Sequence, residues 1–517
     1  MRVISAETMQ EIDRQAIMEY GIPGLQLMES AGHSCVEEII AGFGAFRRCV
    51  VMAGKGNNGG DGYVIARLLG AKGWRVKVII LADREQISGD AATNLEMLSN
   101  SVVHYSAGEG QLSAQYGKDI LQADVIVDAL FGTGLRSTVS GTYLEAIELM
   151  NTSGRPIVAV DIPSGIDGST GLVLGGAVRA NTTVTFAFAK LGHVLYPGAE
   201  YTGRLVVADI GIPLPLMETA SGSDFLNEDT VRPLLQRRGR QAHKGHFGHC
   251  LIIAGSTGKT GAAALSANSA VRAGSGLVTL AAAERIHHIL EMKTTEVMTF
   301  PLPDAGGGYL TESAFPDIET LCVDKDAVAI GPGLDRRQGT SALVQKLVEM
   351  VDLPLVIDAD GLNALAEDIT VLKRKRSNQV ILTPHPGEMS RLTGTSVADV
   401  ESARISTALE FARSYDVFVV LKGARTIIAS PTGEVAINGS GNPGMATGGM
   451  GDVLTGIIVS LLGQGYSAWD TCRLGVFLHG YAADMVADEK GEIGLNATDV
   501  LEKLPYSCNT LLRRMPC

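Results

Sequence analysis

The feature that most constrains this chain is a regular alternation of short strand-like and longer helix-like segments. β-branched runs occupy residues 49–53, 76–81, 125–130, 157–162 and 184–189. Helical spacing of apolar residues occurs at residues 9–18, 25–40, 63–70 and 143–150. Strand–loop–helix alternation predicts a parallel, doubly wound sheet. Ligands of such sheets bind beyond the carboxyl ends of the strands.

A second alternating series begins at residues 249–255 and ends near Leu504. The segment between the two series, residues 213–225, is rich in Pro, Ser and other small residues and is typical of a linker. We therefore predict an α/β protein of two domains, residues 1–220 and residues 226–510, the first with a parallel, doubly wound sheet.

The composition excludes several classes of protein. The net charge of −13 argues against a nucleic-acid binder. The N-terminus has no apolar signal core, and the uncharged run at residues 453–469 is short and polar for a membrane span. The seven cysteines are dispersed and form no CxxC pair, so we expect free thiols and a cytoplasmic location. Glycine, at 62 of 517 residues against an average of about 7%, indicates many tight turns beside small ligands.

The first glycine-rich loop, GKGNNGGDG at residues 54–62, follows a strand and precedes a helix. Its spacing does not match the GxGxxG dinucleotide fingerprint. Asn57 and Asn58 add amide groups and Asp61 adds a carboxylate at the end of the strand. A simple glycine-rich turn is the alternative, but turn chemistry alone does not explain two amides and an acid.

Two further loops are predicted at the same edge of the sheet. Asp128 ends one strand and is followed by the loop 132–138, while Asp161 and Ser164 follow another strand. Asn58, Asp128 and Ser164 offer hard oxygen ligands suited to an alkali or alkaline-earth cation. Taken singly, an Asp at a strand end is more often a helix cap.

The motifs GNNGGDG, VDALFGTG and DIPSG, in this order and spacing, resemble the NAD(P)H-hydrate epimerase family, the YjeF N-terminal domain, over about residues 5–215. The resemblance implies a Rossmann-like fold and an enzyme that interconverts the two C6 epimers of hydrated NADH and NADPH (NADHX and NADPHX). It implies that Asp161 lies at the reacting ring as a catalytic residue and that Asn58, Asp128 and Ser164 hold a potassium ion. The substrate contacts that it implies are Asn57, Asn58, Gly59, Gly60, Asp61, Gly132, Thr133, Gly134, Leu135, Arg136, Ser137, Thr138 and Asp161.

Two motifs of the second half superficially resemble a zinc site and a P-loop. HKGHFGHC at residues 243–250 has three histidines and a cysteine, but Gly245 and Gly248 favour a loop entering a strand over a zinc site. AGSTGKTG at residues 254–261 ends like a P-loop. The first glycine of that pattern is replaced by Ile253, so we reject a Walker-type ATPase.

The strongest signal is NPGMATGGMGDVLTG at residues 442–456. Its glycines precede a long apolar helix whose N-terminus favours an anion. We expect the helix N-terminus to lower the pKa of Asp452 and keep this carboxylate ionised as a base toward an attacking hydroxyl. An N-cap role for Asp452 is the alternative. Lys422, in the loop LKGART, is a candidate phosphate ligand, and His385 lies in a rigid loop between two prolines.

The set HKGxFG, GPG, TPHPGE, KGxxT and GGxGDVLTG resembles the ribokinase-like NAD(P)H-hydrate dehydratase family, the YjeF C-terminal domain, over about residues 228–508. The resemblance implies that ADP, with Mg²⁺, phosphorylates the C6 hydroxyl of the hydrate. Phosphate then leaves, so that NAD(P)H and AMP are formed. The hydrated nucleotide would contact Ala262, Gly333, His385 and Asp452, with Asp452 catalytic. The adenine nucleotide would contact Lys422, Gly423, Ala424, Arg425, Thr426 and Gly451.

Together the two resemblances imply a bifunctional enzyme that repairs NADHX and NADPHX. We also expect a homo-oligomer. Two alternatives stay open. The second half could be a vitamin or sugar kinase of the ribokinase class, which would leave a stable phosphate ester. The first half could be a non-catalytic ligand-binding module, although such a module has no need for Asp128 and Asp161.

Overall fold

The computed structural model describes residues 1–44, 48–98, 103–105, 112–304 and 306–513. The chain divides into two compact units, Arg2–Ser223 and Asp224–Cys517 with Met1. The segment 213–225, predicted as a linker, is not irregular. It contains helix α9 (Leu214–Thr219) and the start of strand β10 (Ser223–Leu226). Its prolines explain the difference, because Pro213 and Pro215 occupy the helix start, where a missing N–H costs nothing.

The N-terminal unit contains nine strands and nine α-helices among its described residues. Its strands are β1 (Arg2–Ile4), β2 (Arg48–Ala53), β3 (Arg75–Ile80), β4 (Val103–Tyr105), β5 (Val125–Ala129), β6 (Ile157–Val160), β7 (Thr182–Phe186), β8 (Ala189–Lys190) and β9 (Arg204–Ala208). Its α-helices are α1 (Ala6–Met18), α2 (Gly24–Phe43), α3 (Asn57–Ala71), α4 (Gly89–Glu96), α5 (Leu112–Gln122), α6 (Gly141–Thr152), α7 (Leu191–Val194), α8 (Ala199–Thr202) and α9.

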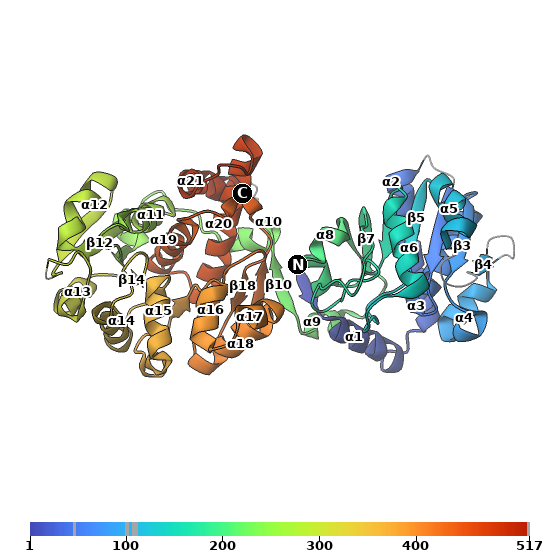
Figure 1. The fold of residues 1–517 in the computed structure, drawn as a ribbon, viewed down its shortest axis with the longest axis horizontal. Coiled ribbons are helices and arrows are strands. Elements are labelled where there is room, and N and C mark those ends of the chain that lie inside the picture. The colour runs from blue at the N-terminus through green and yellow to red at the C-terminus, as the bar shows by residue number, and fades with distance from the viewer. Residues whose placement is uncertain (45–47, 99–102, 106–111, 305, 514–517) are drawn as a thin grey trace. The chain divides into compact units, whose positions relative to one another are not determined.

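The main sheet of this unit has the order β4-β3-β2-β5-β6-β7-β9 with all neighbours parallel. Side chains alternate across it, as the period of two requires. Val51 and Val127 join the core under α1 to α4, whereas Met52 and Ile126 join the core under α5 and α6. The sheet is therefore buried on both faces, as the β-branched runs predict, and its helices flank it in Figure 1.

The C-terminal unit is built in the same way. Its strands are β10, β11 (His249–Ile253), β12 (Leu277–Ala283), β13 (Met298–Leu302), β14 (Ala327–Ile330), β15 (Leu355–Ile357), β16 (Val380–Leu382), β17 (Phe418–Leu421), β18 (Ile427–Ala429) and β19 (Val435–Asn438). Its α-helices are α10 (Glu228–Val231), α11 (Thr260–Arg272), α12 (His287–Lys293), α13 (Phe315–Cys322), α14 (Gln338–Met350), α15 (Asp360–Glu367), α16 (Pro386–Thr393), α17 (Val397–Ser402), α18 (Arg404–Tyr415), α19 (Met450–Gly463), α20 (Ala468–Lys490) and α21 (Ala497–Arg513).

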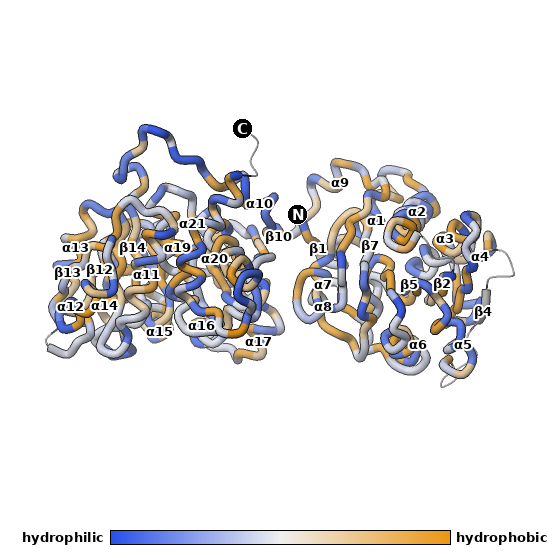
Figure 2. Tube along the Cα trace, turned by 90° about the horizontal axis from the view of Figure 1, so that it is seen from above, coloured by the Kyte–Doolittle hydropathy of each residue, from blue (hydrophilic) through white to orange (hydrophobic). Residues whose placement is uncertain are grey.

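Its sheet runs β13-β12-β11-β14-β15-β16-β17-β18-β19-β10. The pairs from β13 to β17 are parallel, and β17-β18-β19 are antiparallel. Helix α19 is buried almost all round and packs between α11 and α20, which explains its apolar sequence. Figure 2 shows hydrophobic residues concentrated in the sheets and their covering helices and hydrophilic residues in outer loops.

Three smaller predictions can be compared with the structure. The run 184–189 is not one strand, because Ala187 adopts a φ of 59° that separates β7 from β8. Each cysteine among the described residues is a free thiol, as expected. Among the helices that the structure describes, none combines the length and apolar character that crossing a bilayer requires.

Candidate functional sites

The predicted loops of the N-terminal unit converge on one cleft of about 980 Å³. The loops follow β2, β5 and β6, whose carboxyl ends meet at one sheet edge. The predicted residues that line the cleft are Asn57, Asn58, Asp61, Gly132, Thr133, Gly134, Leu135, Arg136, Ser137, Thr138 and Asp161. Gly59 and Gly60 are buried at the start of α3, where a Cβ would lie 2.1 Å from the Gly54 carbonyl oxygen and 2.6 Å from Met28 Sδ. Their contact with a ligand stays a prediction.

Asp161 is anchored at the floor of this cleft by a buried ion pair. Lys190 Nζ donates to Asp161 Oδ1 at 2.7 Å and to Thr185 Oγ1 at 2.8 Å, and the Lys190 side chain is 1% exposed. Burial alone would raise the pKa of Asp161, but the Lys190 ammonium outweighs it and holds the pKa below its usual value. Asp161 also has a φ of 65°, an uncommon conformation for a residue other than glycine. Fold and charge thus keep an ionised carboxylate in the cleft.

Two more carboxyl groups line the same cleft and behave differently. Burial raises the pKa of Asp13, on α1, to about 6, and the charge of Asp161 adds to this effect. Burial and Asp161 likewise raise the pKa of Asp61 well above its usual value. The cleft therefore offers one ionised carboxylate beside two carboxyl groups that hold their protons more tightly, the combination that acid–base chemistry uses.

Asp128 and Ser164 lie together below the cleft. Ser164 Oγ donates to Asp128 Oδ1 at 2.6 Å and Ser164 N donates to Asp128 Oδ2 at 2.8 Å. Both residues are fully buried, and burial raises the pKa of Asp128 to about 6. Asn58 is also buried, and its side-chain Nδ2 has no hydrogen-bond partner. Asp128 and Ser164 thus supply carboxylate and hydroxyl oxygens below the cleft, and Asn58 supplies an amide oxygen in its lining.

The C-terminal unit assembles its candidate site at the carboxyl ends of its parallel strands. Asp358 follows β15, and its carboxylate accepts from Lys422 Nζ at 2.7 Å and from Thr455 Oγ1 at 2.6 Å. A Cβ on Gly451 would lie 3.4 Å from Lys422 Nζ and 3.6 Å from Asp358 Oδ2. These contacts place the KG loop beside the first turn of α19, as the two motifs predict.

Asp452 lies in the first turn of α19, and Gly449, with a φ of 92°, occupies the N-cap position. The alternative that Asp452 is the N-cap is therefore wrong. The expectation that its pKa is lowered is also wrong. Burial, together with the charge of Asp358, raises the pKa of Asp452 to about 7, and Lys422 offsets this only in part. A base with a pKa near neutrality is well matched to catalysis at physiological pH.

His385 and Glu388 form the ends of a capping box on α16. His385 N donates to Glu388 Oε2 at 2.8 Å, and His385 Nδ1 accepts from Gly387 N at 3.0 Å. The His385 side chain is half exposed, while burial, more than any charge, raises the pKa of Glu388 to about 7. Lys422 Nζ lies 3.8 Å from Glu388 Oε2. The rigid loop thus presents His385 and keeps a carboxyl group behind it.

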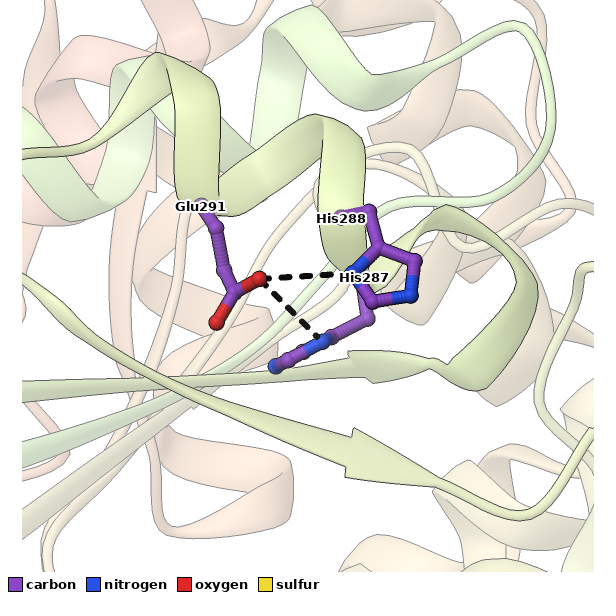
Figure 3. Close-up of side chains that lie close together, drawn as sticks. All are labelled: His287, His288 and Glu291. Atoms are coloured by element: carbon purple, nitrogen blue, oxygen red, sulfur yellow. Dashed lines mark hydrogen bonds and ion pairs between the residues drawn. The ribbon is translucent and has the colours of Figure 1, made fainter.

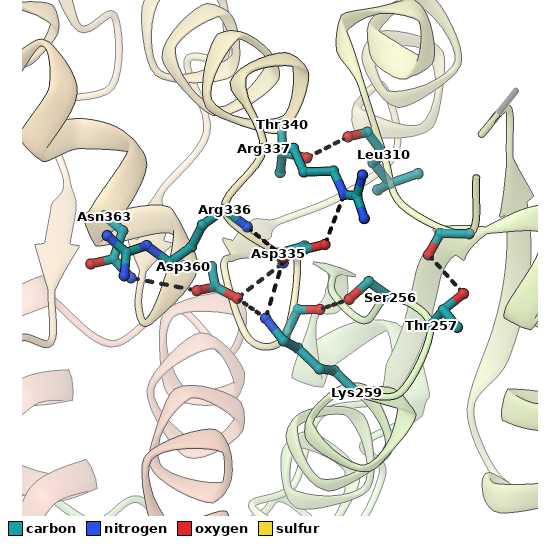
Figure 4. Close-up of polar contacts among 12 residues, drawn as sticks. Ser256, Thr257, Lys259, Leu310, Asp335, Arg336, Arg337, Thr340, Asp360 and Asn363 are labelled. Atoms are coloured by element: carbon teal, nitrogen blue, oxygen red, sulfur yellow. Dashed lines mark hydrogen bonds and ion pairs between the residues drawn. The ribbon is translucent and has the colours of Figure 1, made fainter.

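Gly333 and Ala262, both predicted to contact the hydrated nucleotide, lie next to one another. A Cβ on Gly333 would lie 3.1 Å from Ala262 Cβ and 3.0 Å from Lys259 Cβ. Lys259 Nζ reaches Asp360 Oδ2 at 3.0 Å and lies 3.8 Å from Asp335 Oδ1. Figure 4 shows Lys259 pointing between these two carboxylates. Lys259 of the GKT segment therefore forms ion pairs with the loop that contains Asp335 and with the start of α15.

The loop 422–426 divides into exposed and buried parts. Gly423 and Ala424 are exposed. Thr426 is buried, and its hydroxyl donates a hydrogen bond to the Gly423 carbonyl. Arg425 donates a hydrogen bond to the Gly439 carbonyl at 2.7 Å. Nucleotide contacts of these residues stay predictions.

The residues of HKGHFGHC do not converge on a metal among the described residues. The rings of His243 and His246 stack at 3.8 Å, and His249 Nε2 hydrogen-bonds to Thr279 at 2.8 Å. Residues 244–247 form a 3₁₀ turn before β11, as Gly245 and Gly248 predict. The zinc interpretation finds no support here.

Several residues of both sites are not among those predicted from the motifs. Lys190 directly follows the apolar run 184–189, so its position at the end of a predicted strand was a usable signal. Glu388 ends the quoted TPHPGE loop, and Asp358 and Asp360 follow the apolar run LVI at residues 355–357, so their position after a strand was a usable signal. Asp13 gave no signal, because a polar residue on an amphipathic helix is ordinarily exposed.

Comparisons with known proteins agree with this architecture. A family model described as YjeF-related protein N-terminus matches residues 24–192, and one described as NAD(P)H-hydrate dehydratase matches residues 250–506. The bifunctional NAD(P)H-hydrate repair enzyme Nnr of Moorella thermoacetica is 45% identical over 99% of this chain and 97% of its own length. The enzyme of the same name from Thermofilum pendens is 40% identical over 99% of this chain and 97% of its own.

Among solved structures, the ADP/ATP-dependent NAD(P)H-hydrate dehydratase from Bacillus subtilis, co-crystallised with ATP and Mg²⁺, is similar at 31% identity. The match covers 56% of this chain and 99% of that chain, with a TM-score of 0.49. The two relatives named above match across both halves at well over 30% identity. The chain belongs to the family of bifunctional NAD(P)H-hydrate repair enzymes.

Proposed function

We propose that the two candidate sites divide the repair of NADHX and NADPHX between them. The epimerase site is the cleft of the N-terminal unit, and the dehydratase site is the strand-end site of the C-terminal unit. The observation that carries the proposal is that each unit contains a separate, complete cluster of interacting ionisable groups. The N-terminal unit pairs Asp161 with Lys190. In the C-terminal unit, Lys422 pairs with Asp358, and both influence the pKa of Asp452. A kinase with a ligand-binding module is not favoured, because full-length relatives are repair enzymes in both halves.

Epimerisation at C6 requires a proton to leave the substrate and return while a bond to C6 opens and re-forms. Asp161, ionised by Lys190, is the group that accepts this proton. Asp13 and Asp61 hold protons more tightly and are suited to return one. The loop 132–138 closes the cleft around the substrate.

Potassium fits the residues below this cleft. Asn58, Asp128 and Ser164 supply amide, carboxylate and hydroxyl oxygens, with one negative charge among them. Asp128 is fully buried, its carboxylate accepts hydrogen bonds from Ser164 and from the Leu130 N–H, and burial raises its pKa to about 6. A monovalent ion there would fix the floor of the cleft and neutralise that carboxylate.

In the dehydratase site, Asp452 accepts the proton of the C6 hydroxyl as that hydroxyl attacks the terminal phosphoryl group of ADP. The N–H groups at the start of α19 and the ammonium of Lys422 stabilise the charge on the phosphoryl group. Ala262, Gly333 and His385 hold the hydrated ring, and the loop 422–426 with Gly451 holds the adenine nucleotide. Loss of phosphate and of a ring proton then restores NAD(P)H.

Mg²⁺ fits this site through Glu388. Lys422 Nζ lies 3.8 Å from this buried carboxylate, and His385 Nε2 lies 3.4 Å from it, but burial lowers the pKa of that imidazole, so the charge of Glu388 is only partly compensated. Carboxylate and phosphate oxygens are the ligands that Mg²⁺ prefers, and the ion would neutralise charge on the donor phosphates. Asp358 is less suited, because both its oxygens already accept hydrogen bonds.

The experiment that tests the proposal separates the two reactions in the full chain. Without any adenine nucleotide, the chain should interconvert the epimers of NADHX faster than the spontaneous rate. Adding ADP and Mg²⁺ should then restore reduced nicotinamide and release AMP and phosphate. A stable phosphate ester as the product would indicate a kinase. If the epimers interconvert only at the spontaneous rate, the chain is not an epimerase.

The fragment 1–220 and the fragment 226–510 are the proposed catalytic domains. We propose in addition that the chain forms a homo-oligomer and acts in the cytoplasm. Light scattering at several protein concentrations tests the first point, because a mass equal to one chain throughout would contradict it.

A further inference from the structure

Outside both sites, one cluster on α12 has the composition of a metal site. His287, His288 and Glu291 each offer one ligand atom, and the three atoms lie within 4.8 Å of one another. Over the part of the chain that the structure describes, this is the one such group of three or more His, Cys, Asp or Glu residues. Figure 3 shows the two imidazole rings meeting the carboxylate of Glu291.

The spacing of the ligand atoms is close to what a tetrahedral ion needs. His288 Nδ1 lies 3.4 Å from Glu291 Oε2, and His287 Nδ1 lies 3.9 Å from the same oxygen. Zinc bonds of about 2.0–2.1 Å at tetrahedral angles place ligand atoms about 3.4 Å apart. Of the three pairs, His288–Glu291 already has this spacing, and His287–Glu291 reaches it by a movement of about half an ångström, within a small side-chain rotation. The third pair, between the two histidine nitrogens, lies within 4.8 Å.

A second observation concerns the other nitrogen of His287. His287 Nε2 hydrogen-bonds to the hydroxyl of Thr299, on β13, at 3.0 Å. A histidine that binds a metal ordinarily donates its remaining ring N–H to an oxygen in this way. With the proton on Nε2, donated to Thr299, the lone pair of Nδ1 faces the Glu291 carboxylate and is available to a cation.

The exposure of the three groups fits an ion that enters from solvent. The His287 side chain is 16% exposed and fixed by Thr299, whereas those of His288 and Glu291 are 91% and 51% exposed. One ligand is thus held in place and two can close on an arriving ion, with water completing the coordination. Imidazole with carboxylate favours zinc over magnesium or calcium.

We propose that His287, His288 and Glu291 bind one Zn²⁺ ion on the surface of the C-terminal unit. The ion joins the first and second turns of α12, and through His287 and Thr299 it ties this helix to β13. The site lies on side chains that neither catalytic mechanism uses, so it is independent of the proposed function.

The test is a calorimetric titration of the metal-free full chain with Zn²⁺ at about pH 7.5, where free imidazole is neutral. Excess Mg²⁺ is present to occupy the catalytic carboxylates. We expect one ion per chain, bound at least about tenfold more weakly by His288→Ala and by Glu291→Gln. His246→Ala is the matched control, because His246 is an exposed histidine that stacks on another ring without a carboxylate, and it should bind as the parent does.

Two results would overturn the proposal. The first is equal zinc affinity in the parent, His288→Ala and Glu291→Gln. The second is the absence of zinc binding to the folded parent chain, which would make the cluster an ordinary pair of exposed contacts. Both positions are exposed, so the variants should fold, and thermal melts check this.

Discussion

Replacing Asp452 with Asn should slow dehydration and, at alkaline pH, stabilise the unit that contains it. Asn keeps the size of the side chain and removes the negative charge. A lost general base typically costs about 10²- to 10⁴-fold in rate, so we expect kcat to fall in that range while the affinity for ADP stays close to that of the parent. Epimerisation should be unchanged.

The effect on stability follows from the raised pKa of Asp452. A carboxyl pKa that rises from 3.8 in the unfolded chain to about 7 in the fold corresponds to about 4 kcal/mol, and to about 2 kcal/mol after screening at a partly exposed group. Because the folded state binds the proton more tightly, the parent loses this stability as the pH rises from about 4 to about 7. The Asn variant does not lose it.

The assay combines urea unfolding at about pH 4 and pH 8 with absorbance of restored NADH. We expect similar stability of the two proteins at the lower pH and a more stable variant at the higher pH. Asp488→Asn, an exposed change on α20, is the control and should alter neither quantity. A variant that is less stable than the parent at pH 8, or that keeps near-parental turnover, would refute the reasoning.

Three other changes test the remaining groups. Asp128→Ala should abolish the stimulation of epimerisation by K⁺, measured by chromatography of the epimers, and leave dehydration unchanged. In the parent, protonation of Asp128 should compete with K⁺ binding. The K⁺ concentration needed for the half-maximal rate should therefore rise about tenfold per pH unit below about pH 6. Lys190→Gln leaves Asp161 buried without its cation, so it should destabilise the fold by about 3–5 kcal/mol in urea unfolding and shift the acid limb of the epimerase pH profile to higher pH. Lys422→Ala should weaken ADP binding at least about tenfold by calorimetry, and an unchanged affinity would remove Lys422 from the nucleotide site.

The sheets were predictable because their strands are buried on both faces. Val51, Val127 and Ile253 belong to runs of consecutive apolar residues, a pattern that only a sheet covered by helices on both sides can bury. The segment 213–225 was not predictable, because its prolines are compatible with a linker and with the start of a helix alike.

The loops that build both sites were predictable because glycine and acidic residues follow strands directly. The charge states within them were not. Whether Asp452 is ionised depends on its distance from Asp358 and on its burial, which no sequence pattern encodes. Lys190 and Asp13 were missed for a similar reason, since their importance comes from pairing with Asp161 or facing its cleft.

The central claim is that one chain recovers both epimers of the hydrated cofactor. The most direct measurement incubates the full chain with an equilibrated mixture of NADHX epimers, ADP and Mg²⁺ and follows absorbance of reduced nicotinamide to completion. The account predicts that the whole mixture is converted, and that Asp161→Asn converts one epimer rapidly and the other only at the spontaneous rate of epimerisation. Equal, rapid conversion of both epimers by Asp161→Asn, or a phosphorylated product in place of NADH, would contradict it.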